Sequence, residues 1–168
     1  MTLRLRLTKN QQAAIASANA PTLEADENVK EDFYAQLETI LSETPTEDKI
    51  ILMGDFTAHV GRDSDLRKGT IGKEGVVKSN SNGILLLTKC AEHELITNTL
   101  FQQKEKFKTS WRHPWSKRWH LLDYVIVRAR DRSDVLLTRA MTSADDHWTD
   151  HRLIRSTMKI KIAPKWRL

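Results

Sequence analysis

A short apolar run at 50–53 (IILM), ending directly in Gly54-Asp55, sets the strongest limit on the fold of this chain. A continuous apolar run of this length is typical of a buried strand. A buried strand needs covering layers, which favours a sheet packed between other elements. Sites in α/β folds tend to lie where such strands end. The run therefore predicts a layered α/β protein with Asp55 at the mouth of an inner strand.

In the rest of the chain, the spacing of apolar residues is typical of strands in some segments and of helices in others. Alternating apolar residues predict a strand at 3–7, the stretch QAAIASA predicts a weaker strand at 12–18 that ends before Pro21, and a three-to-four spacing predicts helices at 27–42 and 82–92. Asp26 suits the N-cap of the first helix. The connection at 55–80 is rich in Gly, Asp, Ser and Asn, and loops this long are usually functional or disordered.

The two helices are expected to turn their apolar residues toward the sheet. In the first helix these residues are Val29, Phe33, Leu37, Ile40 and Leu41, and in the second they are Ile84, Leu85, Leu87 and Thr88. Further strands are predicted at 95–99, 106–111, 121–128, 135–141 and 156–162. This order indicates a mixed α/β sheet system with helices on the outside.

Composition excludes several classes of protein. The single cysteine, Cys90, permits no intramolecular disulfide and no cysteine-based zinc site, and its apolar surroundings predict an inert buried thiol. No apolar run reaches the roughly 18 residues of a membrane span. The alternating start MTLRLRLTKN favours a strand over a signal peptide. A reducing compartment, nucleus or cytoplasm, is therefore expected.

The charge is unevenly distributed. Residues 101–168 hold 16 Lys or Arg against 7 Asp or Glu, a net charge of +9, whereas residues 1–100 hold 11 against 15, a net charge of −4. A basic half favours a polyanionic partner such as nucleic acid. A solvated surface without a partner explains the same composition equally well.

Four residues are candidates for chemistry. Asp55 follows the buried strand, although an aspartate that caps a turn after Gly54 is the simpler explanation for that stretch alone. Asp123 lies inside the apolar segment LLDYVIV, where an acid is usually paired or functional. Asp150 and His151 form a pair in which the carboxylate can orient the imidazole. Several carboxylates together favour Mg²⁺ or Mn²⁺.

A segment rich in tryptophan and cations lies between these acids. Aromatic side chains beside cations can stack on bases and hold phosphates, which indicates nucleic-acid contact by Trp111, Arg112, Lys117 and Arg118. Trp111 and Trp148 can equally be core or loop anchors. A zinc site is not expected, because no helical i, i+4 pair occurs among His113, His120 and His147.

Taken in order, these motifs resemble the endonuclease/exonuclease/phosphatase superfamily. The matching elements are Asn19-Ala20-Pro21, Gly54-Asp55-Phe56-Thr57-Ala58, Asp123-Tyr124 and Thr149-Asp150-His151. The sequence between these elements is similar to the endonuclease domain of RTE-type non-LTR retrotransposons, a group that includes host proteins of the craniofacial development protein 2 type. The stretches that carry this closer likeness are NGILLLTKCAEHELITNTLF, TSWRHPWSKRWHLLDYVIVR and WTDHRLI.

The resemblance implies both a fold and a reaction. The fold is a four-layer α/β sandwich, two packed sheets flanked by helices, and the reaction is metal-dependent hydrolysis of a DNA phosphodiester. Asp55 would help to activate the attacking water, Asp123 would support the catalytic His151, and Asp150 would bind the metal, Mg²⁺ or Mn²⁺. The nick would prime reverse transcription.

The sequence also departs from the family pattern. Thr57 stands where the family has Asn, and Asn19 stands where it has Tyr, so both catalytic positions are degraded. The metal-binding Glu of the family's first strands has no counterpart, since the nearest N-terminal acid, Glu24, follows the Asn-Ala-Pro element. Residues 1–163 are therefore predicted to form the C-terminal portion of the domain, a partial sandwich, followed by a basic tail at 164–168.

These departures predict a divergent endonuclease with weak or no activity. A missing part of the sheet would leave an open edge, and a protein partner could complete it. Two alternatives stay open. One is a non-catalytic remnant that binds nucleic acid or protein, and the other is a phosphatase of the same superfamily.

Overall fold

The computed structural model describes residues 1–61, 69–73, 75, 78–144 and 149–162. His147, Trp148, the tail at 164–168 and much of the predicted loop at 55–80 lie outside these residues. None of the described helices is both long enough and apolar enough to cross a membrane.

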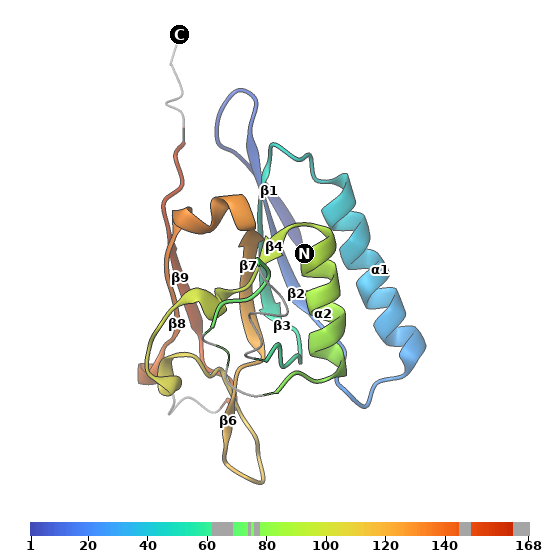
Figure 1. Ribbon diagram of the computed structural model, residues 1–168, viewed down its shortest axis with the longest axis vertical. Helices are drawn as coiled ribbons and strands as arrows, with labels where there is room; N and C mark the ends of the chain where they lie inside the picture. The colour runs from blue at the N-terminus through green and yellow to red at the C-terminus, as the bar shows by residue number, and fades with distance from the viewer. Residues whose placement is uncertain (62–68, 74, 76–77, 145–148, 163–168) are drawn as a thin grey trace.

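A five-stranded sheet forms the centre of the molecule (Figure 1). Its strands, in spatial order, are β1 (Thr2–Arg6), β2 (Gln12–Asn19), β3 (Lys49–Asp55), β7 (Asp123–Arg128) and β4 (Leu95–Ile96). Strand β3 runs parallel to β2 and antiparallel to β7. The apolar run at 50–53 thus lies in the middle of the sheet, as its sequence predicts.

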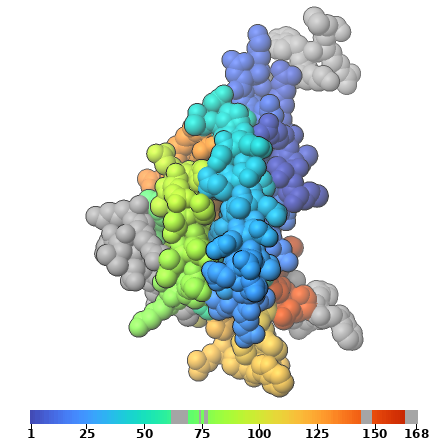
Figure 2. All heavy atoms as spheres, turned by 90° about the vertical axis from the view of Figure 1, so that its right-hand side faces the viewer, coloured from blue at the N-terminus to red at the C-terminus, as the bar shows by residue number. Residues whose placement is uncertain are grey.

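Both α-helices cover one face of this sheet. The helices α1 (Glu27–Glu43) and α2 (Ser81–Glu92) lie side by side (Figure 2). The hairpin of β5 (Trp111–Arg112) and β6 (Trp119–His120) projects beyond them. Asp26 caps α1 as predicted, since its Oδ1 accepts the Asn28 N–H at 2.9 Å. Asn80 caps α2 through a 2.7 Å bond from the Gly83 N–H.

The predicted inward faces of the helices are only partly correct. Leu37 and Leu41 of α1 and Leu87 of α2 are buried, and Phe33 and Ile40 are half-buried, but Val29, Ile84, Leu85 and Thr88 are exposed. The residues that are buried instead are Lys30 and Tyr34 of α1 and Asn82, Gly83, Leu86 and Cys90 of α2. Lys30 Nζ donates to Leu23 O at 2.9 Å, and the Tyr34 hydroxyl donates to Asn82 O at 3.2 Å. Polar groups with such partners can lie on a buried face. The spacing of apolar residues alone therefore predicts the buried face of each helix incorrectly.

A second sheet packs on the other face. It consists of β8 (Val135–Ala140) and β9 (Ile154–Met158), paired antiparallel. Alternate residues of β3 serve the two sides: Ile50 and Leu52 pack among the helices, whereas Ile51 belongs to the cluster that contacts Ile154 and Met158. This alternation is what a strand buried on both faces requires.

Short elements connect these layers. A small hairpin pairs β5 (Trp111–Arg112) with β6 (Trp119–His120). The 3₁₀ turns are η1 (Asn98–Leu100), η2 (Glu105–Phe107), η3 (Ala129–Asp134) and η4 (Thr142–Ala144). The prediction of a strand at 106–111 is therefore wrong. The turn η2 occupies the first residues of this segment, and only Trp111 belongs to a strand. The strand predicted at 95–99 ends at Ile96, and the last strand begins two residues earlier than expected.

The architecture confirms the predicted fold class. Helices, a mixed sheet and a second antiparallel sheet form three successive layers of an α/β sandwich (Figure 1). Cys90 is buried, and burial raises the pKa of its thiol to about 12, so the prediction of an inert thiol agrees with the structure.

Candidate active site

The two acids at the strand ends meet across the central sheet. Asp55, the last residue of β3, lies opposite Asp123, the first residue of β7, in the antiparallel register. Burial raises the pKa of Asp55, and the negative charge of Asp123 adds to this effect, while hydrogen bonding to the Thr57 N–H at 2.7 Å opposes it. A carboxylate whose pKa is raised is a better proton acceptor than an exposed one.

His151 lies between these two carboxylates. Its Nδ1 is 3.1 Å from Asp123 Oδ2, and its Nε2 is 3.7 Å from Asp55 Oδ2. Hydrogen bonding to Asp123 favours the proton on Nδ1 and turns Nε2 toward Asp55. The longer distance exceeds a direct hydrogen bond. The three residues therefore form a row from two strands and the segment before β9.

Asp150 is held beside this row by Trp111. The Trp111 Nε1–H donates to Asp150 Oδ2 at 2.7 Å, and the Arg112 N–H donates to the Asp150 carbonyl at 2.8 Å. Trp111 also forms an isolated antiparallel bridge with His151. Trp111 is thus a loop anchor in this structure, the alternative that its sequence context left open.

Thr57 has an unusual backbone conformation. Its φ of 46° lies in the left-handed region, which is uncommon for a β-branched residue. Its hydroxyl donates to Ala20 O at 3.3 Å, and its carbonyl accepts the Asn82 Nδ2–H at 3.2 Å. The hydroxyl is therefore already used within the protein.

Asn19 is placed less directly. It ends β2 and pairs in register with Asp55, but its side chain is exposed. Within the described residues it is not among those that line the cleft in front of Asp55. The structure therefore brings Asp55, Asp123 and His151 together, with Thr57 beside Asp55. Asp150 precedes His151 in the chain but, like Asn19, is not among the residues that line the cleft.

A cleft of about 520 Å³ opens in front of Asp55 and His151. Its lining residues are Thr22, Leu23, Glu24, Asp55, Thr57, His59, Asn80, Trp111, His113, His120, Leu122 and His151. The cleft therefore joins the two motifs that the sequence places about a hundred residues apart. The lining also contains residues that the sequence alone does not connect with these two motifs.

Two of these lining residues are stacked histidines. The rings of His59 and His120 are 5.3 Å apart and 11° from parallel. Burial lowers the pKa of both side chains, and nearby ionisable groups lower it further: the His120 ring for His59, and His113 and then Arg118 for His120. A lowered pKa keeps both rings neutral at pH 7. They give the cleft a flat, uncharged wall.

Two asparagines fix the loop that carries Thr57 and His59. Asn80 Oδ1 accepts the His59 N–H at 3.0 Å while it caps α2. The buried Asn82 donates from Nδ2 to Pro21 O at 3.0 Å and to Thr57 O. Sequence reasoning missed this role, because the signal is only an Asn before a helix, which predicts a cap and no more.

Ser110 is a second residue that sequence reasoning missed. It is fully buried, and its Oγ accepts the Leu122 and Asp123 N–H groups at 3.2 and 3.0 Å. Its backbone carbonyl accepts the Arg152 N–H at 2.6 Å. Ser110 therefore ties the start of β7 to the segment that follows His151.

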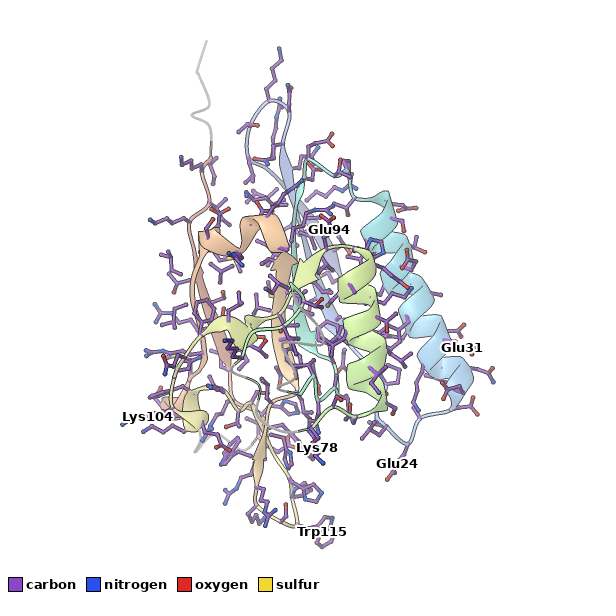
Figure 3. The ribbon with its side chains drawn as sticks, in the orientation of Figure 1. Glu24, Glu31, Lys78, Glu94, Lys104 and Trp115 are labelled. Atoms are coloured by element: carbon purple, nitrogen blue, oxygen red, sulfur yellow. The ribbon has the colours of Figure 1, made fainter. Side chains whose placement is uncertain are left out.

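The predicted nucleic-acid residues lie on the β5–β6 hairpin. Arg112, Lys117 and Arg118 are exposed on it, and Trp115 is 88 % exposed. Figure 3 shows Trp115 at the end of this hairpin, away from the rest of the molecule. The cations are thus presented to solvent next to the cleft.

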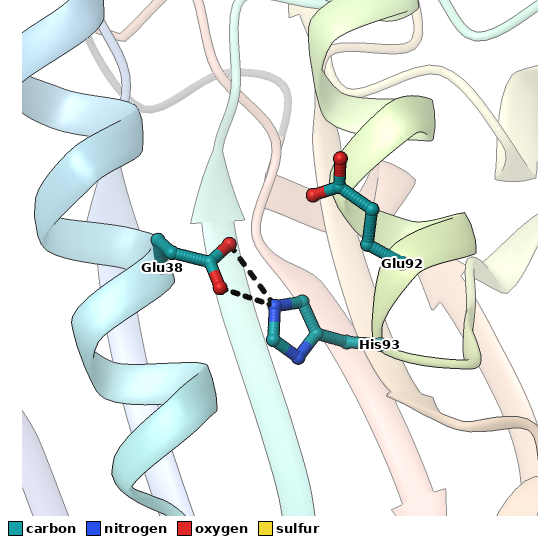
Figure 4. A group of neighbouring side chains, drawn as sticks. All are labelled: Glu38, Glu92 and His93. Carbon is teal, nitrogen blue, oxygen red and sulfur yellow. Dashed lines mark hydrogen bonds and ion pairs between the residues drawn. The ribbon is translucent and has the colours of Figure 1, made fainter.

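The described residues contain one group of three side chains whose ligand atoms all lie within 4.8 Å of one another, Glu38, Glu92 and His93. This group joins α1 and the end of α2 (Figure 4), and none of its members lines the cleft in front of Asp55. Lys89 Nζ already contacts both carboxylates, at 3.0 Å for Glu38 and 2.7 Å for Glu92. The ammonium group neutralises these acids, so the group is an ion-pair network between the helices.

Comparison with solved structures identifies the class of fold. A 3′ phosphatase from Neisseria bound to product DNA hairpin has a TM-score of 0.63 and 14% identity, over 94% of this chain and 64% of that one. The catalytic domain of APE2 from Xenopus laevis has a TM-score of 0.53 and 17% identity, over 98% and 56%. An endonuclease/exonuclease/phosphatase family protein from Leptotrichia buccalis also has a TM-score of 0.53, with 15% identity, over 94% and 52%. The chain therefore has the endonuclease/exonuclease/phosphatase fold.

Among curated proteins, the chain is similar to craniofacial development protein 2. The proteins from Bos taurus and Tragulus javanicus are each 36% identical to it over 149 residues, which is 87% of this chain. The chain spans about a quarter of the length of these relatives. No protein-family model matches it.

Proposed function

We propose that the cleft binds DNA and hydrolyses a phosphodiester bond in one strand. The observation that carries the proposal is the row Asp123–His151–Asp55, with distances of 3.1 and 3.7 Å between neighbours. A structural ion pair needs only one carboxylate per imidazole. A second carboxylate facing the far nitrogen, inside a cleft, is the arrangement that proton transfer at a bound substrate uses.

In the proposed reaction a water molecule lies between Asp55 and the phosphate. Asp55 accepts a proton from this water while the water oxygen forms a bond to phosphorus. The bond between phosphorus and the leaving 3′ oxygen breaks, and that oxygen takes a proton from solvent. Asp123 holds the His151 ring through Nδ1, so that the other ring nitrogen faces the phosphate, where the imidazole helps to stabilise the negative charge of the transition state.

A divalent cation, when bound, would supply further charge neutralisation at the phosphate. Magnesium is usually held by one or two carboxylates together with water and substrate phosphates. Asp150 fits that pattern: Trp111 fixes one of its oxygens, and the exposed carboxylate can offer the other to an ion. Across the part of the cleft that the structure describes, no three ligating side chains converge within 4.8 Å, so we expect a weakly held Mg²⁺ or Mn²⁺.

DNA is the proposed substrate because of the surface around the cleft. The hairpin beside it exposes Arg112, Lys117 and Arg118, and cations in such a position contact phosphates. The motifs that resemble RTE-type retrotransposon endonucleases support the same substrate. On that resemblance, the nick would serve as a primer site for reverse transcription.

Nicking of supercoiled plasmid tests the proposal. We expect the purified chain to convert supercoiled to open-circular DNA slowly with Mg²⁺ or Mn²⁺ and not with chelator. Asp150→Ala should lower the rate by at least about tenfold, since it removes the proposed metal ligand. Asp32→Ala, on the exposed side of α1, is the matched control. Absence of nicking by protein that circular dichroism shows to be folded would contradict the proposal.

One observation favours a non-catalytic alternative. Thr57 and Asn19 stand where the family pattern has Asn and Tyr, the Thr57 hydroxyl donates to Ala20 O, and Asn19 does not line the cleft, so neither position supplies the group that the family pattern assigns to catalysis. A chain that binds DNA with steep salt dependence but does not nick it would be a nucleic-acid-binding module. Release of phosphate from a 3′-phosphorylated oligonucleotide, without nicking, would instead identify a phosphatase.

A further inference from the structure

A second cleft lies next to the first one. It has a volume of about 480 Å³ and shares His120 with the cleft in front of Asp55. Its lining residues are Glu105, Lys106, Thr109, Lys117, Arg118, Trp119 and His120. The base of the β5–β6 hairpin and the turn η2 therefore form this cleft together.

The second cleft is strongly basic. Lys106, Lys117 and Arg118 contribute three positive charges, and Glu105 contributes the one negative charge. All four side chains belong to exposed residues. As far as the structure describes the chain, the three cations form no ion pair with an acid. Unpaired cations grouped at a concave surface attract an anionic ligand.

The hairpin holds two of these cations in a fixed place. The His113 N–H donates to Arg118 O at 2.8 Å, and the Lys117 N–H donates to His113 O at 2.9 Å. Lys117 has a φ of 56°, a left-handed conformation that the tight turn imposes. His113 Nδ1 also accepts the Ser116 N–H at 3.2 Å. Such a turn presents its charges with little loss of backbone entropy on binding.

Trp119, the tryptophan of the second cleft, already contacts cationic side chains of the protein. The guanidinium of Arg152 lies 3.5 Å from the centre of the Trp119 ring, and that of Arg112 lies 5.9 Å from it. The face of the ring that Arg152 covers is closed to a stacked base, whereas Lys106, Lys117 and Arg118 supply the groups that bind phosphate. The chemistry of the cleft therefore favours phosphate groups over nucleobases.

We propose that the second cleft binds a backbone phosphate of the same DNA molecule, next to the phosphate held by Asp55 and His151. This inference rests on the proposed function, because it assigns a subsite of the same substrate. Lys106 on η2 and Lys117 and Arg118 on the hairpin bind the phosphate oxygens. His120 lines both clefts, so the two lie next to each other and one strand can contact both.

The test is DNA binding by fluorescence anisotropy over a range of NaCl concentrations. The probe is a fluorescein-labelled duplex of random sequence, and chelator is present so that no cleavage occurs. The variant carries Lys106→Gln, Lys117→Asn and Arg118→Gln; Asn is chosen at 117 because it tolerates a left-handed conformation. The matched control carries Lys9→Gln, Lys159→Gln and Lys161→Gln. These exposed residues lie on the β1–β2 turn and after β9, toward the other end of the molecule (Figure 1).

Each lost phosphate contact lowers the slope of log affinity against log salt by about 0.9. We expect the cleft variant to bind at least about tenfold more weakly at low salt, with a slope smaller by about 2 to 3. The control should keep the native slope. Equal slopes for the cleft variant and the control would overturn the subsite.

Other outcomes separate the two proposals. A reduced slope in a chain that does not nick plasmid would support the subsite and contradict the proposed hydrolysis. A native chain that nicks DNA, with a cleft variant of unchanged slope, would support the hydrolysis and overturn the subsite. Binding of polyglutamate without binding of DNA would identify an acidic polypeptide as the ligand and overturn the subsite.

Discussion

Among the residues that line the cleft, Thr57 has the most strained backbone conformation. Among the described residues with a positive φ other than glycine, which are Thr57, Glu94 and Lys117, it is the β-branched one. Such backbone strain costs about 1–3 kcal/mol and persists only where the surroundings impose it. Hydrogen bonds from Thr57 to Asp55 and from Asn82 to Thr57 impose it here.

Replacing Thr57 with Asn should relieve this strain. Asn tolerates the left-handed region and keeps the backbone bond to Asp55. We expect Thr57→Asn to raise the free energy of unfolding by about 1 kcal/mol in urea denaturation. The Asn amide can also donate to a phosphate, so the nicking rate should rise.

Thr57→Val is the control for this prediction, because it keeps the branched side chain and removes the hydroxyl that bonds to Ala20 O. It should be less stable than the native chain. An Asn variant no more stable than the native chain would show that residue 57 stores no strain.

At the scale of single elements, sequence patterns found the strands better than the faces of the helices. The stretch QAAIASA at 12–18 and the continuous apolar run at 50–53 predict β2 and β3, because short apolar runs of this kind are typical of strands. The helix faces fail where Lys30 and Asn82 are buried. Their partners, Leu23 O and Pro21 O, belong to the loop after β2, and no local pattern reveals that contact.

The contact between α1 and α2 should depend on pH. Hydrogen bonds from His93, then Lys89 and Ser42, lower the pKa of Glu38 to about 2. A depressed carboxyl pKa contributes stability above the unfolded pKa, and this contribution is lost as pH falls toward 2. Glu38→Gln should therefore lower the melting temperature at pH 7 and have progressively less effect below about pH 4.

The effect of Glu38→Gln should be small, since the Glu38 side chain is 37% exposed and exposed ion pairs contribute about 0–1 kcal/mol. Glu31→Gln, on the exposed side of the same helix, is the control. Thermal melts at several pH values measure both. A difference between the Glu38 and Glu31 variants that is independent of pH would contradict the proposed linkage.

At the scale of the whole molecule, the sequence predicts the chemical groups of the site but not their surroundings. Asp55 and Asp123 could be named in advance because one ends and the other interrupts an apolar stretch, and His151 because it forms an Asp-His pair with Asp150. His59 and His120 could not, because only the folded chain stacks them. The pairing of β3 with β7, which sets Asp55 opposite Asp123, is likewise a long-range choice that local propensity does not determine.

Strand β1 is an open edge of the central sheet. It pairs only with β2 among the described strands, and Leu3 and Leu5 on one of its faces are 57% and 36% exposed. Exposed apolar edge strands promote pairing with another chain. We expect Leu3→Lys with Leu5→Lys to reduce self-association in sedimentation velocity at high protein concentration.

Leu23→Lys is the control for the edge, because Leu23 is similarly exposed, at 44%, but lies in a loop. It should leave self-association unchanged. If both variants associate as the native chain does, the β1 edge is not the surface through which copies meet. If only the β1 variant becomes monomeric, the same edge is where a protein partner would pair.

The most direct test of the proposed chemistry is the single-turnover nicking rate of four proteins: the native chain, Asp123→Asn, His151→Gln and the double variant. If Asp123 acts through His151, each single change should lower the rate by about 10²–10⁴-fold. The double variant should then be no slower than His151→Gln alone. Rate losses that multiply in the double variant, or a native chain without measurable nicking, would contradict a catalytic row of Asp123, His151 and Asp55.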